Sequence, residues 1–380
     1  MNINIIGSTG EIGNKTLYLI TKFYPKIRIN LLVANKNVDK LIIQCKKYNP
    51  KVIYINDQKK IVTLRKKISK KIRIVTDISK YLKSTKSNAT ILSVSGYQSL
   101  FYFNDIIYNT KIIGLVNKEC IVSAGHIFKK ILKKYNTKFF PLDSEHFSLN
   151  NFFNNQKCKY SNIYLTASGG PFFQRSFDDI KSASFEQASN HPKWKMGYKN
   201  SIDSATLVNK CLEIIEAHYL FDISYEKIKP VIHPEALIHS IIEFYDHTSQ
   251  LNYFYNDMSI PIINFLDSLY SKEHFKENKT FKFNSSNKLS FYEVDTNNYP
   301  VYKIFKQINK SNPEELIKFN IINEFAIELF KKDKILFGDI HKIINNSLSI
   351  NLHSSLNTIE NILYYHEEFK RRLNKKYEYI

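Results

Sequence analysis

The sequence is short of cysteine and of long apolar runs, and both absences exclude classes of protein. Its 380 residues include four scattered cysteines that form no C-x-x-C pair: Cys45, Cys120, Cys158 and Cys211. This arrangement excludes a disulfide framework and a cysteine zinc site, and it indicates free thiols in a reducing compartment. No apolar run reaches the roughly 18 residues that a membrane-spanning helix needs, and the chain begins directly in a strand-like segment. We therefore expect a cytoplasmic protein without a signal or transit peptide and without a membrane partner.

Acidic residues are also scarce, because 35 Asp and Glu stand against 55 Lys and Arg, which gives a net charge of +20. A basic nucleic-acid-binding protein is one interpretation of such a charge. The lysines are spread along the chain, however, and Asn, Ile, Tyr and Phe are abundant too, which is the composition that an AT-rich genome produces. We interpret the charge as compositional and predict no nucleic-acid partner, although the charge would attract phosphorylated substrates at long range.

The alternation of strand-like and helix-like patterns divides the chain into regions. Residues 1–142 contain strand candidates separated by helical stretches: 2–6, 28–34, 51–55, 72–76, 89–95 and 111–116. Alternation of this kind predicts an α/β domain with a Rossmann-like parallel sheet covered by helices. Residues 143–275 predict an α+β catalytic or connecting domain, 276–299 a polar linker, and 300–380 a helical domain.

Three glycines follow the first strand candidate in the stretch GSTGEIG, at Gly7, Gly10 and Gly13. A glycine-rich turn between a strand and a helix offers backbone N–H groups to a phosphate, and glycine permits a close approach. The spacing is G-x-x-G-x-x-G rather than the usual G-x-G-x-x-G of dinucleotide-binding folds, so a simple tight turn is the alternative. The position between strand and helix favours a phosphate-binding turn.

The second strand candidate ends about 20 residues after this turn, where NAD-binding folds carry an acidic residue for the ribose 2′-hydroxyl. This chain has Asn35, Lys36 and Asn37 there instead. An ammonium group and two amides would bind a 2′-phosphate that a carboxylate would repel. These residues favour NADP over NAD, and the alternative is that Lys36 is one more surface lysine in a lysine-rich chain.

Two carboxylates stand two residues apart in the stretch PLDSEHFSL. In an extended segment, Asp143 and Glu145 would point the same way and Ser144 would face away. Two converging carboxylates suit a hard divalent cation such as Mg²⁺ or Mn²⁺. The alternative is a solvated acidic turn, but acidic residues are scarce in this chain, and the pattern favours a metal site.

A strong helical pattern follows Asp203 and Ser204, which are both good N-cap residues. Its apolar stripe has helical spacing and consists of Leu207, Val208, Cys211, Leu212 and Ile215. On the other face, Asn209, Lys210 and Glu213 are neighbours. Glu213 is a candidate third metal ligand, and Asn209 and Lys210 are candidates for a phosphate. Local spacing alone favours the alternative, a surface ion pair.

Two further polar segments have features of an anion-binding site. Ser168-Gly169-Gly170 follows a short strand candidate and offers a hydroxyl and close backbone N–H groups. The stretch HPKWKMG places His191, Trp194 and Met196 in an otherwise polar region, residues 189–201. Such a polar segment favours a lid over a buried loop, with His191 donating to a phosphate. A lone histidine is more often structural, and this is the alternative for His191.

Taken in order, these motifs resemble the 1-deoxy-D-xylulose 5-phosphate reductoisomerase family. The stretches that carry the resemblance are GSTGEIG, LVANKNV, LVNKEC, PLDSEH, LTASGGPF, HPKWKMG, SIDSATLVNKCLEIIEAHYLF and VIHPEALIHS. The match runs from residue 3 to about 245 and weakens beyond, where INEFA at 322–326 is similar to an Asn-Glu segment of the family. The resemblance implies formation of 2-C-methyl-D-erythritol 4-phosphate from 1-deoxy-D-xylulose 5-phosphate, the committed step of the non-mevalonate route to isoprenoid precursors. It also implies NADPH and a divalent metal (Mg²⁺, Mn²⁺ or Co²⁺) as cofactors, and a homodimer.

The resemblance assigns roles to individual residues. NADPH is expected to contact Thr9, Gly10, Glu11, Ile12, Asn35, Lys36, Asn37, Asn117, Glu119 and Gly197. The metal is expected on Asp143, Glu145 and Glu213, and these carboxylates together with Lys118 form the expected catalytic set. The phosphosugar substrate is expected to contact Lys118, Ser144, Glu145, Ser168, His191, Ser204, Asn209, Lys210 and Glu213, with Trp194 and Met196 in the lid.

Some residues depart from the family pattern, and two further interpretations stay open. Glu11 stands where Ser is common, Asn35 and His247 stand where Gly is common, and the stretch NDMSIPI lacks a frequent Arg. None of these changes removes an expected catalytic group. A semialdehyde-type NADP dehydrogenase is a second enzyme interpretation, but no cysteine here has the context of a nucleophile. A decayed, inactive relative is another, against which the intact carboxylate and lysine sets argue.

Overall fold

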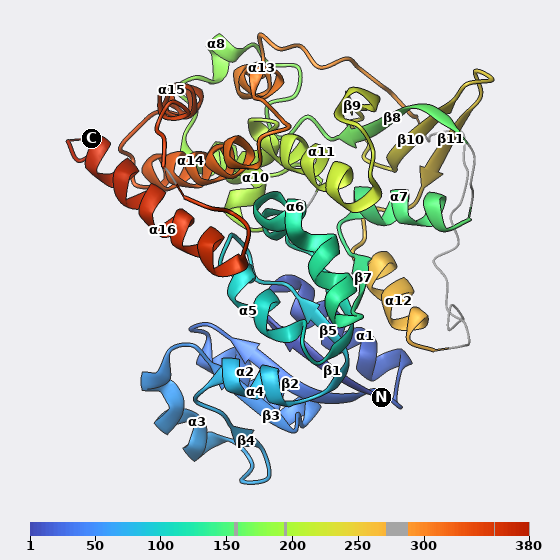
Figure 1. Cartoon of the computed structure of the whole chain (residues 1–380), viewed down its shortest axis with the longest axis vertical. Coiled ribbons are helices and arrows are strands. Elements are labelled where there is room, and N and C mark those ends of the chain that lie inside the picture. Colours follow the sequence, from blue (N-terminus) through green and yellow to red (C-terminus); the bar gives the residue numbers. More distant parts are fainter. Residues whose placement is uncertain (156–158, 194–195, 271–287, 353, 380) are drawn as a thin grey trace. The chain divides into compact units, whose positions relative to one another are not determined.

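The chain forms two compact units in the computed structural model, which describes residues 1–155, 159–193, 196–270, 288–352 and 354–379 (Figure 1). Unit one consists of Met1–Asn117, Lys129–Phe147 and Asp257–Lys279. Unit two consists of Lys118–Phe128, Ser148–Asn256 and Thr280–Ile380. Each unit is therefore assembled from segments that lie far apart in the sequence.

Unit one is built on a parallel sheet of seven strands in the order β4-β3-β2-β1-β5-β6-β7. The strands are β1 (Asn2–Ile6), β2 (Arg28–Ala34), β3 (Val52–Ile55), β4 (Arg73–Ile74), β5 (Ser87–Leu92), β6 (Thr110–Leu115) and β7 (Lys138–Pro141). Apolar runs such as β3, in which every residue is buried, form strands that are covered on both faces. The strand order reverses at β1, which pairs with β2 and β5. Ligands of such sheets lie beyond the carboxyl ends of the strands at this point.

All but the last of the unit-one helices follow the expected alternation with strands. They are α1 (Glu11–Phe23), α2 (Val38–Tyr48), α3 (Ile61–Lys67), α4 (Ile78–Ser84), α5 (Ser99–Ile106) and α12 (Ser259–Ser268), with the short 3₁₀ helix η1 (Gln58–Lys60). Helix α12 comes from late in the chain and packs on α1, where the Tyr24 hydroxyl lies 2.8 Å from Asp267 Oδ1. Two more helices, α6 (Lys118–Tyr135) and α7 (Ser144–Asn155), contribute residues to both units.

All six strand candidates are strands in the structure, with ends shifted by up to three residues. Strand β7 was not among them. It is only four residues long and ends in Pro141, which weakens its strand signal. Proline is tolerated there because β7 is the last strand of the sheet among the described residues and pairs with β6.

Unit two contains a smaller, mixed sheet in the order β11-β10-β8-β9. Strand β8 (Tyr160–Ala167) pairs parallel with β9 (Ile228–Ile232) and antiparallel with β10 (Ile238–Phe244), which pairs antiparallel with β11 (Ser249–Tyr253). The helices between β8 and β9 in the sequence are α8 (Phe177–Ile180), α9 (Phe185–Ser189), α10 (Tyr198–Ala205) and α11 (Val208–Phe221), with η2 (Tyr225–Lys227). The apolar stripe of α11 is buried, and this helix packs against β8 and β9.

The C-terminal residues of unit two form the expected helical region. Its helices are α13 (Pro300–Gln307), α14 (Pro313–Lys331), α15 (Ile340–Ser347) and α16 (Ile359–Lys376), with η3 (Phe337–Asp339). Helix α14 is buried over most of its circumference and contacts α10, α11, α15 and α16. Its Phe319 and Ile322 belong to the same hydrophobic core as Leu212 of α11. The sheet and the helical region of unit two therefore share one core.

The expected linker at 276–299 lies partly outside the described residues, which resume at residue 288. In the described part, Tyr292 forms a bridge with Ile232 at the end of β9, and Tyr299 is buried with its hydroxyl 3.0 Å from Gly169 O. The end of this segment is thus packed into unit two.

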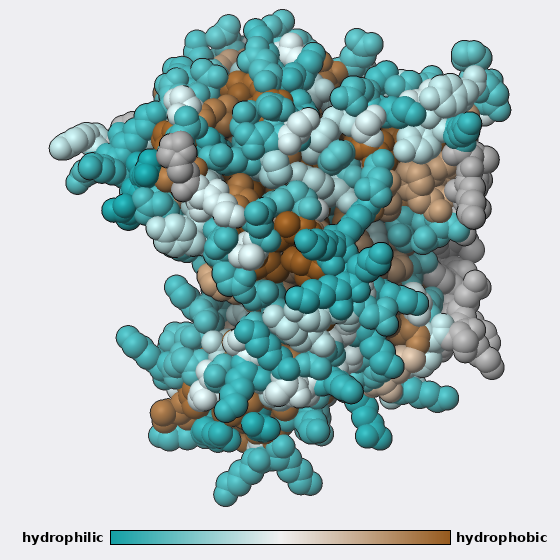
Figure 2. All heavy atoms as spheres, in the orientation of Figure 1, coloured by the Kyte–Doolittle hydropathy of each residue, from teal (hydrophilic) through white to brown (hydrophobic). Residues whose placement is uncertain are grey.

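The face of the molecule shown in Figure 2 is mostly hydrophilic, with apolar side chains among many polar ones. Among the described residues, no helix combines the length and the apolar character needed to cross a membrane. Cys45, Cys120 and Cys211 form no disulfide among the described residues, and all three are buried. Cys158 lies outside the described residues.

Unit two contains a buried histidine, and we therefore expect its stability to fall in acid. His366 on α16 is 2% exposed, and its Nε2 lies 3.0 Å from Ser123 Oγ of α6. Burial, with a contribution from Lys370, lowers the pKa of His366 from 6.5 to about 3. The unfolded chain takes up a proton at this residue as the pH falls below its ordinary value, whereas the folded chain does not. We therefore expect the free energy of unfolding to fall by roughly 1 kcal/mol per pH unit between about pH 6 and pH 4.

Denaturant unfolding, followed by circular dichroism at several pH values in this range, measures how steeply the free energy of unfolding changes with pH. His366→Gln should make this change less steep, because glutamine does not titrate. His247→Asn is the matched control, since His247 is exposed and asparagine tolerates its φ of 65°. Equal slopes for the unmodified chain and His366→Gln would contradict the assignment.

Candidate active site

The glycine-rich turn joins β1 to α1 at the point where the strand order reverses. Gly7 has a φ of +86°, and a Cβ there would lie 2.6 Å from the backbone oxygen of Ser93. A Cβ on Gly13 would lie 2.5 Å from the backbone oxygen of Gly7. Helix α1 begins after Gly10 without a capping side chain from the described residues, which leaves its first N–H groups for an anion.

The residues expected near a 2′-phosphate lie at the carboxyl end of β2. Asn35, Lys36 and Asn37 are all exposed, and the Asn37 side chain accepts a hydrogen bond from the backbone of α2 as its N-cap. Asn117, which follows β6, is buried instead, and its Nδ2 donates to Val94 O at 2.8 Å. The Asn117 side chain therefore ties the carboxyl ends of β5 and β6 together.

Asp143 and Glu145 do not lie on an extended segment, so this part of the prediction was wrong. Helix α7 begins at Ser144, which puts Glu145 in the first helical turn directly after Asp143. Asp143 Oδ1 accepts from the backbone N–H of Glu145 at 3.2 Å. Ser144 Oγ donates to Glu145 Oε2 at 2.6 Å, so Ser144 does not face away. The carboxylates still converge, because oxygens of Asp143 and Glu145 lie within 4.8 Å of each other.

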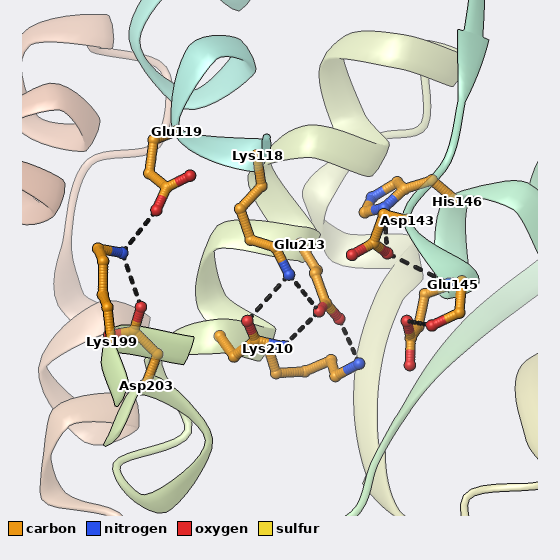
Figure 3. Close-up of polar contacts among 11 residues, drawn as sticks. Lys118, Glu119, Asp143, Glu145, His146, Lys199, Asp203, Lys210 and Glu213 are labelled. Atoms are coloured by element: carbon orange, nitrogen blue, oxygen red, sulfur yellow. Dashed lines mark hydrogen bonds and ion pairs between the residues drawn. The ribbon is translucent and has the colours of Figure 1, made fainter. Parts of the chain in front are cut away.

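His146 was not predicted as part of this group. It is fully buried, and its Nδ1 lies 2.9 Å from Asp143 Oδ1 (Figure 3). The contact fixes the orientation of the Asp143 carboxylate. A side chain three positions after a residue at a helix start lies on the same face, and this spacing in DSEH is the signal that could have identified His146.

A buried polar cluster in unit two brings together residues that are far apart in the sequence (Figure 3). Lys118 Nζ, from the start of α6, lies 2.8 Å from Glu213 Oε1 and 2.9 Å from Asn209 Oδ1 on α11. Lys210 forms an ion pair with Glu213 Oε2, and Asn209 Nδ2 donates to Glu213 Oε1. Lys118, Lys210 and Glu213 are 7%, 2% and 1% exposed. The expected surface ion pair is therefore a buried one, with two ammonium groups around one carboxylate.

The single helix expected after Asp203 is two helices in the structure, and the prediction that Asp203 and Ser204 form its N-cap was wrong. Asp203 and Ser204 lie inside α10, which ends at Ala205, and α11 begins at Val208. Leu207 stands between the two helices in the left-handed conformation, with a φ of 64°. The sequence gives no sign of this break, because the residue is neither glycine nor asparagine.

The side chains of Ser168 and His191 meet at the Ser-Gly-Gly turn in unit two, and the backbone of Ser204 lies against this turn. Ser168 Oγ lies 2.9 Å from His191 Nε2, and it accepts from the backbone N–H of Gly170 at 3.2 Å. Gly170 has a φ of +70°, and a Cβ there would lie 2.7 Å from the backbone oxygen of Ser204. Only glycine therefore lets the turn approach the backbone of α10 so closely.

His191 is neutral at physiological pH. Its Nδ1 accepts from the backbone N–H of Lys193 at 3.2 Å, so Nε2 carries the proton and donates to Ser168. Burial lowers the pKa of His191 from 6.5 to about 4. The imidazole can therefore offer a hydrogen bond to an anion rather than a full charge.

The lid prediction falls partly outside the described residues, because Trp194 is not among them. Met196 is half-buried, and Gly197 is exposed at the N-terminus of α10.

Three family models match this sequence. The model for 1-deoxy-D-xylulose 5-phosphate reductoisomerase matches residues 3–125, and the model for its C-terminal domain matches residues 139–221. A further model, for the DXP reductoisomerase C-terminal domain, matches residues 255–372. The chain belongs to the 1-deoxy-D-xylulose 5-phosphate reductoisomerase family.

Individual reductoisomerases are similar over nearly the whole chain. The one from Pelagibacter ubique is 37% identical over 347 residues, which cover 89% of this chain and 88% of the relative. The one from Thermoanaerobacter sp. strain X514 is 35% identical over 377 residues, which cover 98% of each chain. A solved reductoisomerase from Zymomonas mobilis in complex with NADPH has a TM-score of 0.87 at 28% identity, covering 100% of this chain and 99% of that chain. Another, in complex with NADPH, fosmidomycin and magnesium, has a TM-score of 0.86 at 28% identity, covering 99% and 98%.

The family, the α/β fold class and the enzyme class predicted from the motifs are thereby confirmed. The chain's relatives are named for the reductoisomerase reaction on 1-deoxy-D-xylulose 5-phosphate. The semialdehyde-type dehydrogenase and the nucleic-acid-binding interpretations are not needed.

Proposed function

We propose that this chain converts 1-deoxy-D-xylulose 5-phosphate to 2-C-methyl-D-erythritol 4-phosphate with NADPH and a divalent metal, and that the residues expected from the sequence carry this reaction. The observation that carries the proposal is the buried cluster of Lys118, Asn209, Lys210 and Glu213 in unit two. Two ammonium groups, an amide and a carboxylate on one buried surface suit a polar, phosphorylated ligand. The solved relatives in complex with NADPH and with magnesium support both cofactors.

NADPH would be held mainly at the carboxyl ends of β1 and β2. The residues proposed to contact it are Thr9, Gly10, Glu11, Ile12, Asn35, Lys36, Asn37, Asn117, Glu119 and Gly197. The tight turn and the N-terminus of α1 fit a pyrophosphate, and the exposed Lys36 fits a 2′-phosphate. Bound NADPH supplies the hydride that reduces the branched aldehyde formed from the substrate.

The divalent metal would be held by Asp143, Glu145 and Glu213. Carboxylate oxygens suit Mg²⁺ or Mn²⁺, and we propose these, with Co²⁺ as a substitute. Each proposed ligand is already oriented by a neighbour: Asp143 by His146, Glu145 by Ser144, and Glu213 by the two lysines. When bound, the metal acts as a Lewis acid on the carbonyl and hydroxyl oxygens of the substrate.

The substrate would be held at both of its ends. We propose Ser168, His191, Ser204, Asn209 and Lys210 at the phosphate and hydroxyls, and Lys118, Ser144, Glu145 and Glu213 near the reacting carbons. Lys118 is held by Asn209 and Glu213, so its ammonium is oriented as a donor for an oxygen on which negative charge develops. Binding of the phosphate away from the reacting carbons positions the carbon skeleton for rearrangement.

The remaining parts of the proposal concern the roles of the domains, the lid, the oligomeric state and the cellular location. We propose that NADPH binding is the task of residues 1–142, metal and substrate binding that of 143–275, and that 300–380 supports them after a linker at 276–299. Trp194 and Met196 are proposed to cover the substrate, which would exclude water from the intermediate. We further propose a homodimer in the cytoplasm, with no nucleic-acid or membrane partner.

Oxidation of NADPH that depends on 1-deoxy-D-xylulose 5-phosphate tests the function and the choice of cofactor together. The unmodified chain should prefer NADPH to NADH, and Lys36→Asp should reduce that preference roughly 10- to 100-fold, because a hydrogen bond to a charged group is worth about 1.5–3 kcal/mol. Lys46→Asp, at an exposed lysine near the end of helix α2, which follows Lys36, should leave the preference unchanged. Absence of substrate-dependent oxidation would overturn the function, and equal use of both cofactors would overturn the assignment of Lys36.

A further inference from the structure

A second buried charge cluster in unit two centres on Lys199, which has no role in the proposed site, although its partner Glu119 is a proposed NADPH contact. Lys199 of α10 places its Nζ 2.6 Å from Glu119 Oε1 on α6 and 2.8 Å from Asp203 Oδ2 on its own helix (Figure 3). The side chains of Lys199, Glu119 and Asp203 are 16%, 5% and 1% exposed. One ammonium group therefore bridges two buried carboxylates from separate helices.

Helix α14 adds a third side to this cluster. Asn323 Nδ2 donates to Asp203 Oδ1 at 2.7 Å, so Asp203 is held from both α10 and α14. Glu324, the next residue on α14, accepts from Asn320 at 3.4 Å and interacts electrostatically with Lys199. Burial raises the pKa of Glu324 to about 7, with Glu119 and Asp203 adding to the effect and Lys199 opposing it.

The electrostatics keep the bridge charged at neutral pH. Burial alone would raise the pKa of Glu119, but the charge of Lys199 outweighs it and holds that pKa below its usual value. Burial would likewise lower the pKa of Lys199, and Asp203 and Glu119 outweigh it in the other direction. Without the ammonium group, carboxylates of like charge would face each other in a buried site and move apart.

The two bridged carboxylates stand next to residues of the proposed site. Glu119 directly follows Lys118 in the first turn of α6, and Asp203 directly precedes Ser204 in α10. Lys118 reaches Glu213 and Asn209, and the backbone of Ser204 lies against the Ser-Gly-Gly turn. A displacement of either carboxylate would therefore move a substrate-binding residue with it.

We propose that Lys199 is a positioning residue of the reductoisomerase reaction, because its bridge between Glu119 and Asp203 fixes the helix segments that present Lys118 and Ser204. Lys199 acts through these neighbours and touches no reacting atom. The inference rests on the roles proposed above for Lys118 and Ser204.

Comparison of Lys199→Met with Lys318→Met, in the full chain with NADPH and Mg²⁺, tests this. Lys318 on α14 is a matched control, because its side chain is 4% exposed and pairs with Glu314 at 3.1 Å away from the proposed site. Lys199→Met should lower kcat at saturating substrate about 100-fold, the effect of roughly 1 Å of misplacement. Its dissociation constant for NADPH should rise only through Glu119 and Gly197, because the other proposed NADPH contacts lie in unit one, and kcat is therefore measured at saturating NADPH. Lys318→Met should lower the melting temperature and leave kcat of the folded protein unchanged.

Glu119→Gln is the second variant, and it keeps the test decisive where Lys199→Met fails to fold. It removes one arm of the bridge and leaves Lys199 paired with Asp203, so no buried charge is left alone. Kcat at saturating NADPH and substrate should fall about 10-fold or more, and Lys199→Arg, which keeps the charge, should retain more activity than Lys199→Met.

The outcomes separate this inference from the proposed function. An unmodified chain that does not turn over 1-deoxy-D-xylulose 5-phosphate would overturn the proposed function itself. An active unmodified chain, with kcat unchanged in folded Lys199→Met or in Glu119→Gln at saturating NADPH, would overturn the positioning role. A kcat that falls as far in Lys318→Met as in Lys199→Met, for the same loss of melting temperature, would also overturn it. Loss of a purely structural lysine would then account for the effect on kcat.

Discussion

Removal of divalent cations with EDTA is expected to lower turnover of 1-deoxy-D-xylulose 5-phosphate by at least about 10³-fold, and Mg²⁺ is expected to restore it. A Lewis acid on the substrate oxygens contributes several kcal/mol of charge stabilisation, and each 1.4 kcal/mol is about a factor of ten in rate. The proposed ligands are prepared for a cation by their neighbours, because His146 contacts Asp143 and the Ser144 hydroxyl donates to Glu145. Turnover measured over a titration of Mg²⁺ after EDTA treatment and dialysis checks this.

Binding of NADPH is the control for this experiment. Its proposed contacts lie mostly in the β1–α1 turn and at the end of β2, so its affinity should persist in EDTA. Glu213→Gln should weaken the apparent Mg²⁺ affinity while leaving NADPH affinity nearly unchanged. Full activity in the chelated enzyme would refute the assignment of the three carboxylates.

Substitution of Lys118 is expected to have the second largest effect. Lys118→Met should lower kcat about 10²- to 10³-fold, the usual loss when one oriented donor to a developing oxyanion is removed. The loss of stability should be smaller than for most buried charges, because Glu213 keeps its ion pair with Lys210 when Lys118 is absent. Steady-state kinetics and thermal unfolding of the same preparation measure both quantities.

Lys181→Met provides the matched control for Lys118→Met. Lys181 forms an exposed ion pair with Asp178, at 3.2 Å and with a lysine side chain that is 59% exposed. Exposed pairs of this kind contribute about 0–1 kcal/mol to stability, so neither kcat nor unfolding should change appreciably. A Lys118→Met enzyme whose kcat at saturating substrate stays within about two-fold of the unmodified enzyme would show that Lys118 has no role in the reaction.

The sequence was most informative where burial and local pattern agree. Strands such as β1 and β3 are buried in a parallel sheet, so their apolar runs predict them directly. The turn with Gly7 was predictable for a related reason, because a positive φ and a close backbone approach leave little choice of residue. The family motifs then supplied residue roles that spacing alone left open.

The features that the sequence did not predict depend on where helices begin and on which side chains from distant segments are neighbours in space. Asp143 and Glu145 were treated as neighbours on an extended segment, but α7 begins between them and changes the directions of their side chains. The left-handed Leu207 carries no signature in its residue type. Lys199 is one basic residue among 55, and its importance depends on Glu119, with which it shares no local pattern.

The late position of α12 in the chain has a consequence for synthesis. All seven strands of the unit-one sheet have left the ribosome once residue 141 has emerged, yet the core that they help to form also contains Ile262, Phe265 and Leu266 of α12. At typical bacterial and eukaryotic elongation rates, this helix follows on the order of ten seconds later. The nascent sheet therefore leaves apolar surface uncovered during that interval, and its core can be completed only after all four strands of the unit-two sheet have been synthesised. Chaperone dependence of folding in this protein should accordingly be set by the delay before α12 arrives, rather than by the stability of the finished fold.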